Sequence, residues 1–368
     1  MRTRAAPPPA GGGGARVALK SALEPFAAPD GTLYLIDATS RARFAVRDAA
    51  PWQVALVEQL HGGARSEDEL ASSLDAEPGQ VADALDALAA AGVLAPDSGE
   101  GPLDEEVGER YARQLLYFAD ELGGGDAARA AQRRLAAATV AIVGCGGLGS
   151  WALAALACAG VGRLVLVDDD TVALSNLNRQ LLFRRADVGR LKVEAAAEAV
   201  RAFAPELEVV PLCRRVASEA DAHDVVAGAD VVVETADWPP YLLTRWLDSA
   251  CRRIGAAHIS AAQQPPVLRV GPLRVPGRSP CLRCWEGEVR RRHPLYDAIA
   301  EGRLRRSRAA PTVGYAAAAV GGVLASEVVH HLTGVADPAT LRSAWILDLR
   351  TLESRREEWD APRCRCEL

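Results

Sequence analysis

Aromatic side chains and methionine are scarce in this chain of 368 residues, because aromatics make up 5% and methionine occurs once. A hydrophobic core therefore has to be built mainly from Ala, Val and Leu, which suits helices packed closely on a parallel sheet. The chain also lacks an excess of positive charge, since 42 basic side chains stand against 48 acidic ones. This balance excludes a globally basic nucleic-acid binder, and a hydrophobic content of 49% excludes a disordered chain.

A long uninterrupted hydrophobic segment is missing as well. The uncharged stretch 139–162 divides into a β-rich run, a glycine loop and an Ala/Leu-rich run, which indicates a strand, a loop and a helix in place of a membrane span. Residues 1–16 are rich in Pro and Gly without an apolar signal core, so we predict a disordered tail. The eight cysteines are then expected in a reducing cytoplasm, where close pairs bind metal more readily than they form disulfides.

The length is typical of about two domains. Residues 17–98 combine two β-like runs with three amphipathic helical runs, which predicts a small α+β, winged-helix-like domain. After a short linker, residues 104–368 are predicted to form an α/β domain. There, from residue 139, β-rich and helical runs alternate, as in a doubly wound, Rossmann-like sheet. The segment 281–310 breaks this alternation, and we predict a long crossover loop for it.

A glycine loop with the sequence GCGGLGS spans Gly144 to Ser150, between a β-rich run and a helical run. Such a loop lets backbone N–H groups and a helix N-terminus approach a phosphate closely. Asp168 ends the next β-rich run, where an acid can bind ribose hydroxyls. On these residues alone, an NAD-dependent dehydrogenase is the first interpretation.

The following residues favour a triphosphate. The run 168–180 reads DDDTVALSNLNRQ, and Lys192 begins a helix. Fixed Arg and Lys charges indicate a triphosphate whose charge is redistributed during a reaction. Carboxylates in the same site imply Mg²⁺. Asp237 follows the fourth β-rich run, at the edge where open sheets bind their ligands.

These motifs together resemble the ThiF/MoeB-like adenylyltransferases of the ubiquitin-activating-enzyme superfamily, from about Glu109 to the C-terminus. The resemblance implies that a carboxylate attacks the α-phosphorus of ATP in a homodimeric enzyme. It implies ATP-binding roles for Gly144, Gly146, Gly147, Gly149, Asp168, Asp170, Ser175, Asn176 and Gln180, and catalytic roles for Arg113, Arg179, Lys192 and Asp237.

Two of these positions carry more specific expectations. Arg113, in the motif RYARQ, is expected to reach the ATP phosphates of the other subunit, and Asp237 to bind Mg²⁺ or orient the α-phosphate. Trp238 departs from the family pattern, in which Asn follows that Asp. We therefore expect the substrate side of the pocket to differ from that of relatives.

Two close cysteine pairs, Cys281 with Cys284 and Cys364 with Cys366, stand where the family has its zinc knuckles. The resemblance implies that four thiolates hold a structural Zn²⁺. The second pair is C-x-C where relatives have C-x-x-C, and free surface thiols are the alternative. No cysteine follows in 285–311, although relatives that form a thioester or persulfide use one in this loop, so attack by another nucleophile is expected. The arginines of this loop either guide an acidic or C-terminal carboxylate substrate or lie in a solvated loop.

The first domain resembles the PqqD-like peptide-recognition domain, or RiPP recognition element, of enzymes that modify ribosomal peptides. Such domains bind a leader peptide as an added strand. A DNA-binding winged helix is the alternative, but its third helix would carry Asp83 and Asp86 and no Lys or Arg, which disfavours a nucleic-acid partner.

The two domains together resemble the enzymes that adenylate microcin C-type precursor peptides. We therefore expect a leader-guided adenylyltransferase that activates a carboxylate of a precursor peptide, without a membrane partner. One alternative is a sulfur-carrier adenylyltransferase that acts on a ubiquitin-like Gly-Gly C-terminus. The other is a non-catalytic leader-binding partner of a cyclodehydratase.

Overall fold

The computed structural model describes residues 16–37, 43–77, 79–99, 101–305, 311–358 and 366. Apart from Arg16, the predicted disordered tail lies outside the described residues. The chain divides into two compact units, Met1–Arg133 and Arg134–Leu368.

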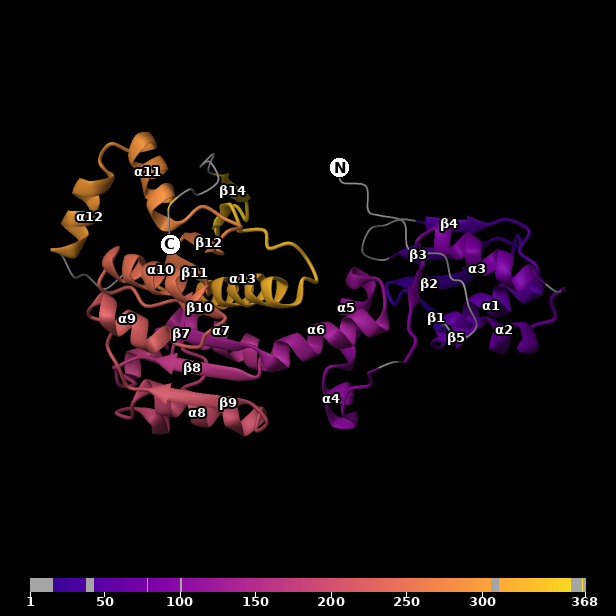
Figure 1. Cartoon of the computed structure of the whole chain (residues 1–368), viewed down its shortest axis with the longest axis horizontal. Coiled ribbons are helices and arrows are strands. Elements are labelled where there is room, and N and C mark those ends of the chain that lie inside the picture. Colours follow the sequence, from indigo (N-terminus) through magenta and orange to yellow (C-terminus); the bar gives the residue numbers. More distant parts are fainter. Residues whose placement is uncertain are drawn as a thin grey trace. The chain divides into compact units, whose positions relative to one another are not determined.

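Two small antiparallel sheets and three helices form most of the first unit (Figure 1). One sheet has the order β2-β3-β4 and the other β5-β1-β6. The strands are β1 (Arg16–Leu19), β2 (Leu23–Ala27), β3 (Leu33–Asp37), β4 (Arg43–Val46), β5 (Arg65–Ser66) and β6 (Leu94–Pro96). The helices are α1 (Pro51–His61), α2 (Glu67–Ser73) and α3 (Gln80–Ala90), and they lie where the apolar spacing predicts them.

The first unit has a hydrophobic core of its own. Leu33 and Leu35 of β3 pack with Leu56 and Leu60 of α1 and with Leu70 of α2, and all five side chains are buried. Leucines recur at these positions because one face of each helix and alternate residues of the strand point inward. Since this core is contained within the unit, the packing of the sheets does not depend on the α/β part of the chain.

Three helices follow, namely α4 (Glu105–Arg110), α5 (Ala112–Leu122) and α6 (Gly125–Ala137). The first two are separate helices because the backbone leaves helical geometry at Tyr111, with φ −100° and ψ 12°. Asp120 of α5 accepts a hydrogen bond of 2.7 Å from the Ser21 hydroxyl. Arg129 of α6 forms an ion pair of 2.7 Å with Asp97. Both contacts lie within the first unit and hold α5 and the start of α6 in it. The domain boundaries expected at 98 and 104 stay predictions.

An eight-stranded sheet organises the second unit, in the order β14-β13-β12-β11-β10-β7-β8-β9. The five strands from β11 to β9 in this order are parallel, and β12, β13 and β14 are added antiparallel. This confirms the predicted α/β, Rossmann-like fold. The strands are β7 (Thr139–Val143), β8 (Arg163–Val167), β9 (Glu208–Leu212), β10 (Val231–Glu234), β11 (Ala257–Gln264), β12 (Val267–Arg274), β13 (Ser343–Asp348) and β14 (Ser354–Glu358).

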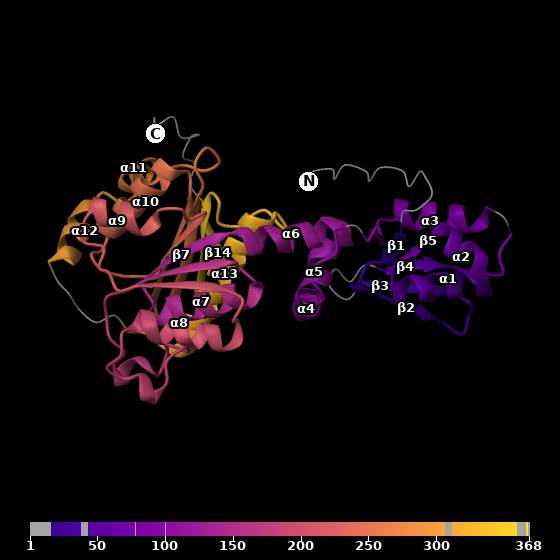
Figure 2. The same cartoon turned by 60° about the horizontal axis from the view of Figure 1, so that its bottom comes forward.

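Helices cover both faces of the sheet (Figure 2). One face carries α7 (Gly147–Ala159), α8 (Lys192–Phe203) and α13 (Gly314–Thr333), and the other carries α9 (Glu219–Val226) and α10 (Leu242–Ile254). The central strands are continuous runs of Val, Ile, Ala and Leu because side chains on both faces are buried beneath helices. Among the described residues, no helix is both long enough and apolar enough to span a bilayer.

The crossover loop predicted for 281–310 is wrong for the described part of that segment, which forms α11 (Leu282–Arg292) and α12 (Tyr296–Leu304). The helical pattern of α11 lies in its charges. Glu288 pairs with Arg291 and Arg292, and Glu286 pairs with Arg290, at spacings of three and four residues. Such pairs stabilise a helix without apolar periodicity, which is why a search for hydrophobic spacing misses it.

Strand order places the functional edge of the sheet between β7 and β10. From β7 the chain moves outward through β8 and β9 and then returns to β10 on the other side of β7. Ligands of open α/β sheets bind at such a switch point, beyond the carboxyl ends of the strands. Gly144 follows β7 and Asp237 lies beyond the end of β10, so the predicted glycine loop and the predicted catalytic acid belong to this edge.

Replacing Gly149 by alanine tests the packing beneath the loop. A Cβ at Gly149 would lie 1.9 Å from the Gly144 carbonyl oxygen, so we expect Gly149→Ala to destabilise the chain by at least roughly 1–3 kcal/mol. Gly322→Ala on α13 is the control, because nothing lies within 4 Å of its Cβ, and it should stabilise by roughly 0.5–1 kcal/mol. Urea unfolding measures both, and equal stability of the two variants would contradict the packing described here.

Candidate active site

The glycine loop packs directly against the chain segment that follows β10. Gly144 has a φ of +102°, and a Cβ there would lie 2.5 Å from the Ala236 nitrogen, so only glycine fits. The Thr235 hydroxyl donates a hydrogen bond of 2.6 Å to the Gly144 carbonyl oxygen. The two strand ends therefore form one rigid floor, from which α7 begins at Gly147.

Asp168 closes one side of the loop at the end of β8. Its carboxylate accepts hydrogen bonds from the backbone N–H of Cys145 at 2.7 Å and of Asp170 at 2.9 Å. Burial raises the pKa of Asp168, although the nearby Lys192 and these two N–H donors oppose the shift. Burial also raises the pKa of the Cys145 thiol, with the Asp168 charge adding to the effect, so this cysteine is a poor nucleophile.

Two cations lie in this region. The Lys192 ammonium, in a residue that is 7% exposed, forms an ion pair of 2.8 Å with Asp170. The Arg179 guanidinium donates to the Ser175 carbonyl oxygen at 2.7 Å and to the Asn178 side-chain oxygen at 3.0 Å. Both side chains are thereby oriented by groups of the 168–180 run, and a bound anion would meet cations already in place.

A cavity of about 690 Å³ extends from the glycine loop along the ends of the strands. The predicted site residues that line it are Gly144, Gly146, Gly147, Asp168, Asp170, Asn176, Arg179, Gln180, Lys192 and Asp237. Gly149 and Ser175 do not line it, because Gly149 packs beneath the loop and Ser175 is exposed outside. Arg113 belongs to α5 of the first unit, and its expected contact with ATP stays a prediction.

Two amide side chains that line the cavity, those of Asn176 and Gln180, differ in their hydrogen bonding. Asn176 is tied to its own loop, because its side-chain oxygen accepts the Ala173 N–H at 2.9 Å. Gln180 is 3% exposed, and its Oε1 atom has no hydrogen-bond partner among the described residues. An unpaired buried acceptor is unfavourable, so Gln180 is suited to a donor group on a ligand, such as a hydroxyl.

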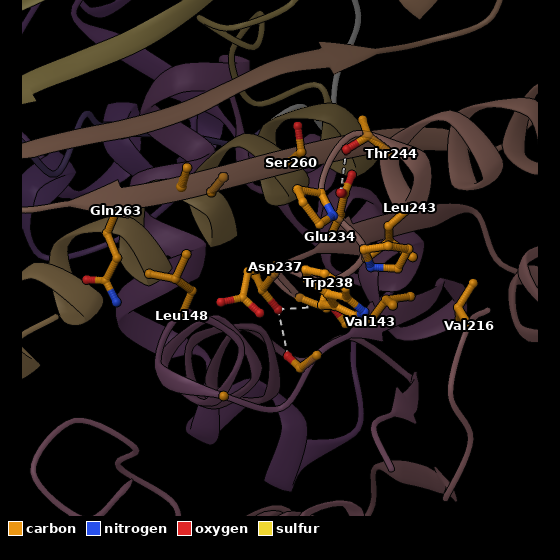
Figure 3. A pocket seen from close by; sticks show the side chains of 18 of the residues that line it. Val143, Leu148, Val216, Glu234, Asp237, Trp238, Leu243, Thr244, Ser260 and Gln263 are labelled. Atoms are coloured by element: carbon orange, nitrogen blue, oxygen red, sulfur yellow. Dashed lines mark hydrogen bonds between the residues drawn. The ribbon is translucent and has the colours of Figure 1, made fainter. Parts of the chain in front are cut away.

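Beyond Asp237, the cavity wall becomes aromatic and basic. Tyr241, Trp285 and Tyr296 line this part of the cavity. Trp238, which is 46% exposed, lines it beside Asp237 (Figure 3). Tyr296 stacks edge-on against both Tyr241 and Trp285, at ring-centroid distances of 5.7 and 6.4 Å. Burial and the neighbouring Glu286 raise the pKa of Tyr296, so its hydroxyl stays neutral and donates to Glu286 at 3.2 Å.

Arg269 is the cation of this wall. It pairs with Glu357 of β14 at 2.7 Å and lies over the Trp285 ring, 5.8 Å from the centroid. Desolvation lowers the pKa of the Arg269 guanidinium, but the Glu357 carboxylate opposes the shift. The aromatic wall, formed by Trp238, Tyr241, Trp285 and Tyr296 with Arg269, is thus suited to a ligand that has both an apolar body and an anionic group.

Three of the four predicted zinc ligands lie together. The sulfur atoms of Cys281, Cys284 and Cys366 are within 4.8 Å of one another, and the Sγ atoms of Cys284 and Cys366 are 3.5 Å apart. Cys364 lies outside the described residues. A set of thiols at this separation fits the donor chemistry of Zn²⁺. The carboxylates of Asp168, Asp169 and Asp170 form a second group within the same separation, which fits Mg²⁺, but Asp237 is not part of it.

Comparison with known proteins identifies the family. Residues 111–368 match the ThiF family. The chain belongs to the ThiF family. It is 33% identical over 251 residues to the sulfur carrier protein ThiS adenylyltransferase of Escherichia coli K12, a match that covers 68% of this chain and 88% of that protein. It is 40% identical over 183 residues to the SAMP-activating enzyme E1 of Haloferax volcanii, covering 50% of this chain and 63% of that protein.

A solved structure shows the same fold over a longer part of the ThiF-family chain. Escherichia coli MccB with ATP has a TM-score of 0.75 to it at 22% identity, and the match covers 95% of this chain and 98% of that chain. At this identity the likeness shows the fold alone. The ThiF family and the names of its curated relatives support an adenylyltransferase.

Several lining residues of this ThiF-family chain escaped the sequence reasoning. Arg214 and Arg215 follow β9 and line the nucleotide side, where Arg215 pairs with Asp169 at 2.8 Å. They stand at the carboxyl end of a predicted strand, so their position relative to the strand is the signal that could have found them. Gln263 lies on β11 and Arg269 lies on β12. Neither strand is predicted from the sequence, and no local motif marks these two residues.

Zinc content tests the cysteine cluster. We expect about one equivalent of zinc per chain, and less after Cys284→Ser, because a thiolate ligand is lost. Cys158→Ser is the matched control, since Cys158 is an exposed cysteine of α7 outside the cluster. Metal analysis of the purified chains decides the point, and a parent chain with far less than one equivalent would show that the thiols are free.

Proposed function

We propose that this chain is an ATP-dependent adenylyltransferase that activates a carboxylate of a ribosomally made precursor peptide. One observation carries the proposal: in a ThiF-family chain, a single cavity at the switch point is lined by the glycine loop, Arg179, Lys192 and Asp237. This arrangement joins a nucleotide site to an adjoining wall for a second substrate. Both substrates of an adenylation can thus lie in one cavity.

The proposed reaction needs no proton transfer from the protein. A carboxylate oxygen of the substrate attacks the α-phosphorus of ATP, and the bond from that phosphorus to the bridging oxygen breaks. The oxygen leaves with the electron pair as part of pyrophosphate, and the products are an acyl-adenylate and pyrophosphate. Because two anions must approach each other, the main task of the protein is to supply positive charge and orientation.

The nucleotide side offers groups for each part of ATP. The backbone N–H groups of the glycine loop and the start of α7 receive phosphate oxygens, and Asp168 receives ribose hydroxyls. Lys192 and Arg179 neutralise charge on the phosphates and on the leaving pyrophosphate. Mg²⁺, when bound, would add positive charge beside the phosphates, and the acids at 168–170 are the residues suited to hold it. A direct contact of Asp237 with the ion stays a prediction.

The first unit is the proposed leader-binding domain. Its sheet β2-β3-β4 has two edges, and Pro25 in β2 lacks the N–H that an added strand would need. The β4 edge is therefore the better place for a leader peptide that binds as an extra strand. In support, the fold of MccB matches 95% of this chain, and further structures of MccB, described as a microcin C7 biosynthetic enzyme, contain MccA.

In this proposal the enzyme acts in the cytoplasm as a homodimer in which Arg113 reaches the ATP of the other subunit.

A second candidate substrate is a ubiquitin-like carrier protein with a Gly-Gly C-terminus. It is favoured by the 33% identity to the ThiS adenylyltransferase, which the chain matches over 88% of that protein. The aromatic wall argues for the peptide, because a Gly-Gly end has no side chains to place against Trp238, Tyr241, Trp285 and Tyr296. A non-catalytic leader-binding partner is disfavoured because Arg179, Lys192 and Asp237 all line the cavity.

Removal of single charges tests the adenylation step. We expect Arg179→Ala and Asp237→Ala to abolish pyrophosphate–ATP exchange, because loss of one preorganised contact to the reacting charges costs about 3–4 kcal/mol. Arg350→Ala and Asp337→Ala, which change exposed residues in surface ion pairs, are the matched controls and should exchange like the parent chain. Exchange at the parent rate in both site variants, with the parent melting temperature, would defeat the assignment.

Substrate choice is tested with the full chain. Exchange should depend on a precursor peptide, taken from candidates encoded beside the gene, and removal of the leader should raise the KM for the peptide while the KM for ATP stays unchanged. The reason is that the leader contributes binding energy away from the reacting carboxylate. Exchange that depends on a Gly-Gly carrier protein, with no response to any peptide, would establish the alternative.

A further inference from the structure

The segment that carries Asp237 is closed at its base by a hydrogen bond between its two flanking residues. This segment, the Asp237 loop, runs from Thr235 to Leu243 and comprises the connection between β10 and α10 together with the first two residues of α10. Glu234 is the last residue of β10, and its Oε1 atom accepts a hydrogen bond of 2.6 Å from the Thr244 hydroxyl near the start of α10 (Figure 3). Both residues line the cavity, so this bond lies in the cavity wall beside the loop that it closes.

The other oxygen of Glu234 is held by a buried histidine. His258 of β11 is 1% exposed, and its Nε2 atom lies 3.0 Å from Glu234 Oε2. Arg274 of β12 lies 3.0 Å from the other ring nitrogen, Nδ1. Because a guanidinium can only donate, Nδ1 must be the acceptor, and the ring hydrogen is on Nε2, which donates to Glu234. The arginine thus selects the tautomer that fixes the carboxylate.

Arg274 completes a closed ring. Its Nε atom lies 2.9 Å from Asp248 Oδ1 in an ion pair without hydrogen-bond geometry, and Asp248 lies one helical turn after Thr244 on α10. The order of contacts is therefore Thr244, Glu234, His258, Arg274, Asp248 and, through the turn of α10, back to Thr244. Burial acts to raise the pKa of Asp248, but the Arg274 guanidinium and the Leu282 N–H act to lower it, and that pKa lies below its usual value. The ring thus joins β10, β11, β12 and α10.

This ring contains more charge than stability requires. Two acids, a histidine and one guanidinium lie in it away from solvent, and a buried ionic cluster is often no more stable than apolar residues of the same volume. Its geometry has a different effect, because it fixes the distance between the end of β10 and the first turn of α10. Within the loop, the backbone N–H groups of Thr235 and Ala236 bond to Val143, and that of Leu243 to Pro239. Asp237 lies between these fixed points.

We propose that the ring is a positioning device for Asp237, with Glu234 and Thr244 as positioning residues for the adenylation step. The proposal rests on the proposed function for its kinetic consequence. A carboxylate that must orient the α-phosphate or its magnesium ion has to be held in place before the substrates arrive, and a misplacement of about 1 Å can cost on the order of 100-fold in rate. The ring supplies this fixation from the base of the loop.

Thr244→Val is the decisive variant because it keeps the shape of the side chain and removes only the donor to Glu234. We expect hydrogen–deuterium exchange of the amides in 235–243 to rise several-fold, since the base of the loop is no longer closed. The kcat of pyrophosphate–ATP exchange should fall on the order of 10- to 100-fold, while the KM for ATP stays within about twofold. Thr244→Ser keeps a hydroxyl and should restore both properties.

Thr333→Val is the matched control. Thr333 of α13 likewise donates its hydroxyl hydrogen to a protein oxygen, the Val329 carbonyl at 2.6 Å, but it is buried and does not line the cavity. This variant should lose stability and keep the parent kcat and the parent exchange of 235–243. If Thr244→Val leaves the protection of 235–243 unchanged, the proposed ring function is wrong. If the parent chain has no pyrophosphate–ATP exchange with any substrate, the proposed function fails. The hydrogen–deuterium exchange of 235–243 in Thr244→Val still tests whether the ring fixes the loop.

Discussion

The close packing of the glycine loop against the end of β10 is the constraint on which the rest of the second unit depends. Gly144 fits beside Ala236 only because it has no side chain, and Thr235 bonds back to the Gly144 carbonyl oxygen. Two neighbouring strands that are separated by about 90 residues of chain thereby share one edge. The strand order places β7 beside β10, so the proposed phosphate site and the proposed catalytic acid lie next to each other at this edge. Both are needed at the same place for the proposed reaction.

The sequence predicts those parts of the molecule that follow local rules. Alternation of β-rich and helical runs predicts the parallel sheet, and the GCGGLGS loop and the DDDTVALSNLNRQ run predict the residues that line the nucleotide side of the cavity. The wall beyond Asp237 could not be predicted in this way. Arg269, Trp285 and Tyr296 come from three separate elements, and only the antiparallel additions to the sheet and the helices α11 and α12 bring them together.

Charge pairing explains why the sequence pattern predicts a loop where α11 and α12 form. It also explains part of the specificity expected of the site. In α11 the buried acids Glu286 and Glu288 are neutralised by arginines of the same helix, so a segment with few apolar residues can fold over a cavity. Glu286 is also the acceptor for the Tyr296 hydroxyl and for Arg245. Glu286 thus stabilises the helix and also orients the Tyr296 side chain, which lines the cavity.

The position of Cys145 has a consequence for oxidative damage. This thiol lies within the glycine loop, is fully buried, and has a raised pKa, whereas Cys158 and Cys213 are exposed. Oxidants and alkylating reagents attack accessible thiolates, so they would modify exposed cysteines such as Cys158 and Cys213 before Cys145. A maleimide dye or spin label can therefore be attached to Cys158 or Cys213 while the Cys145 thiol stays intact, and labelling does not require prior removal of Cys145.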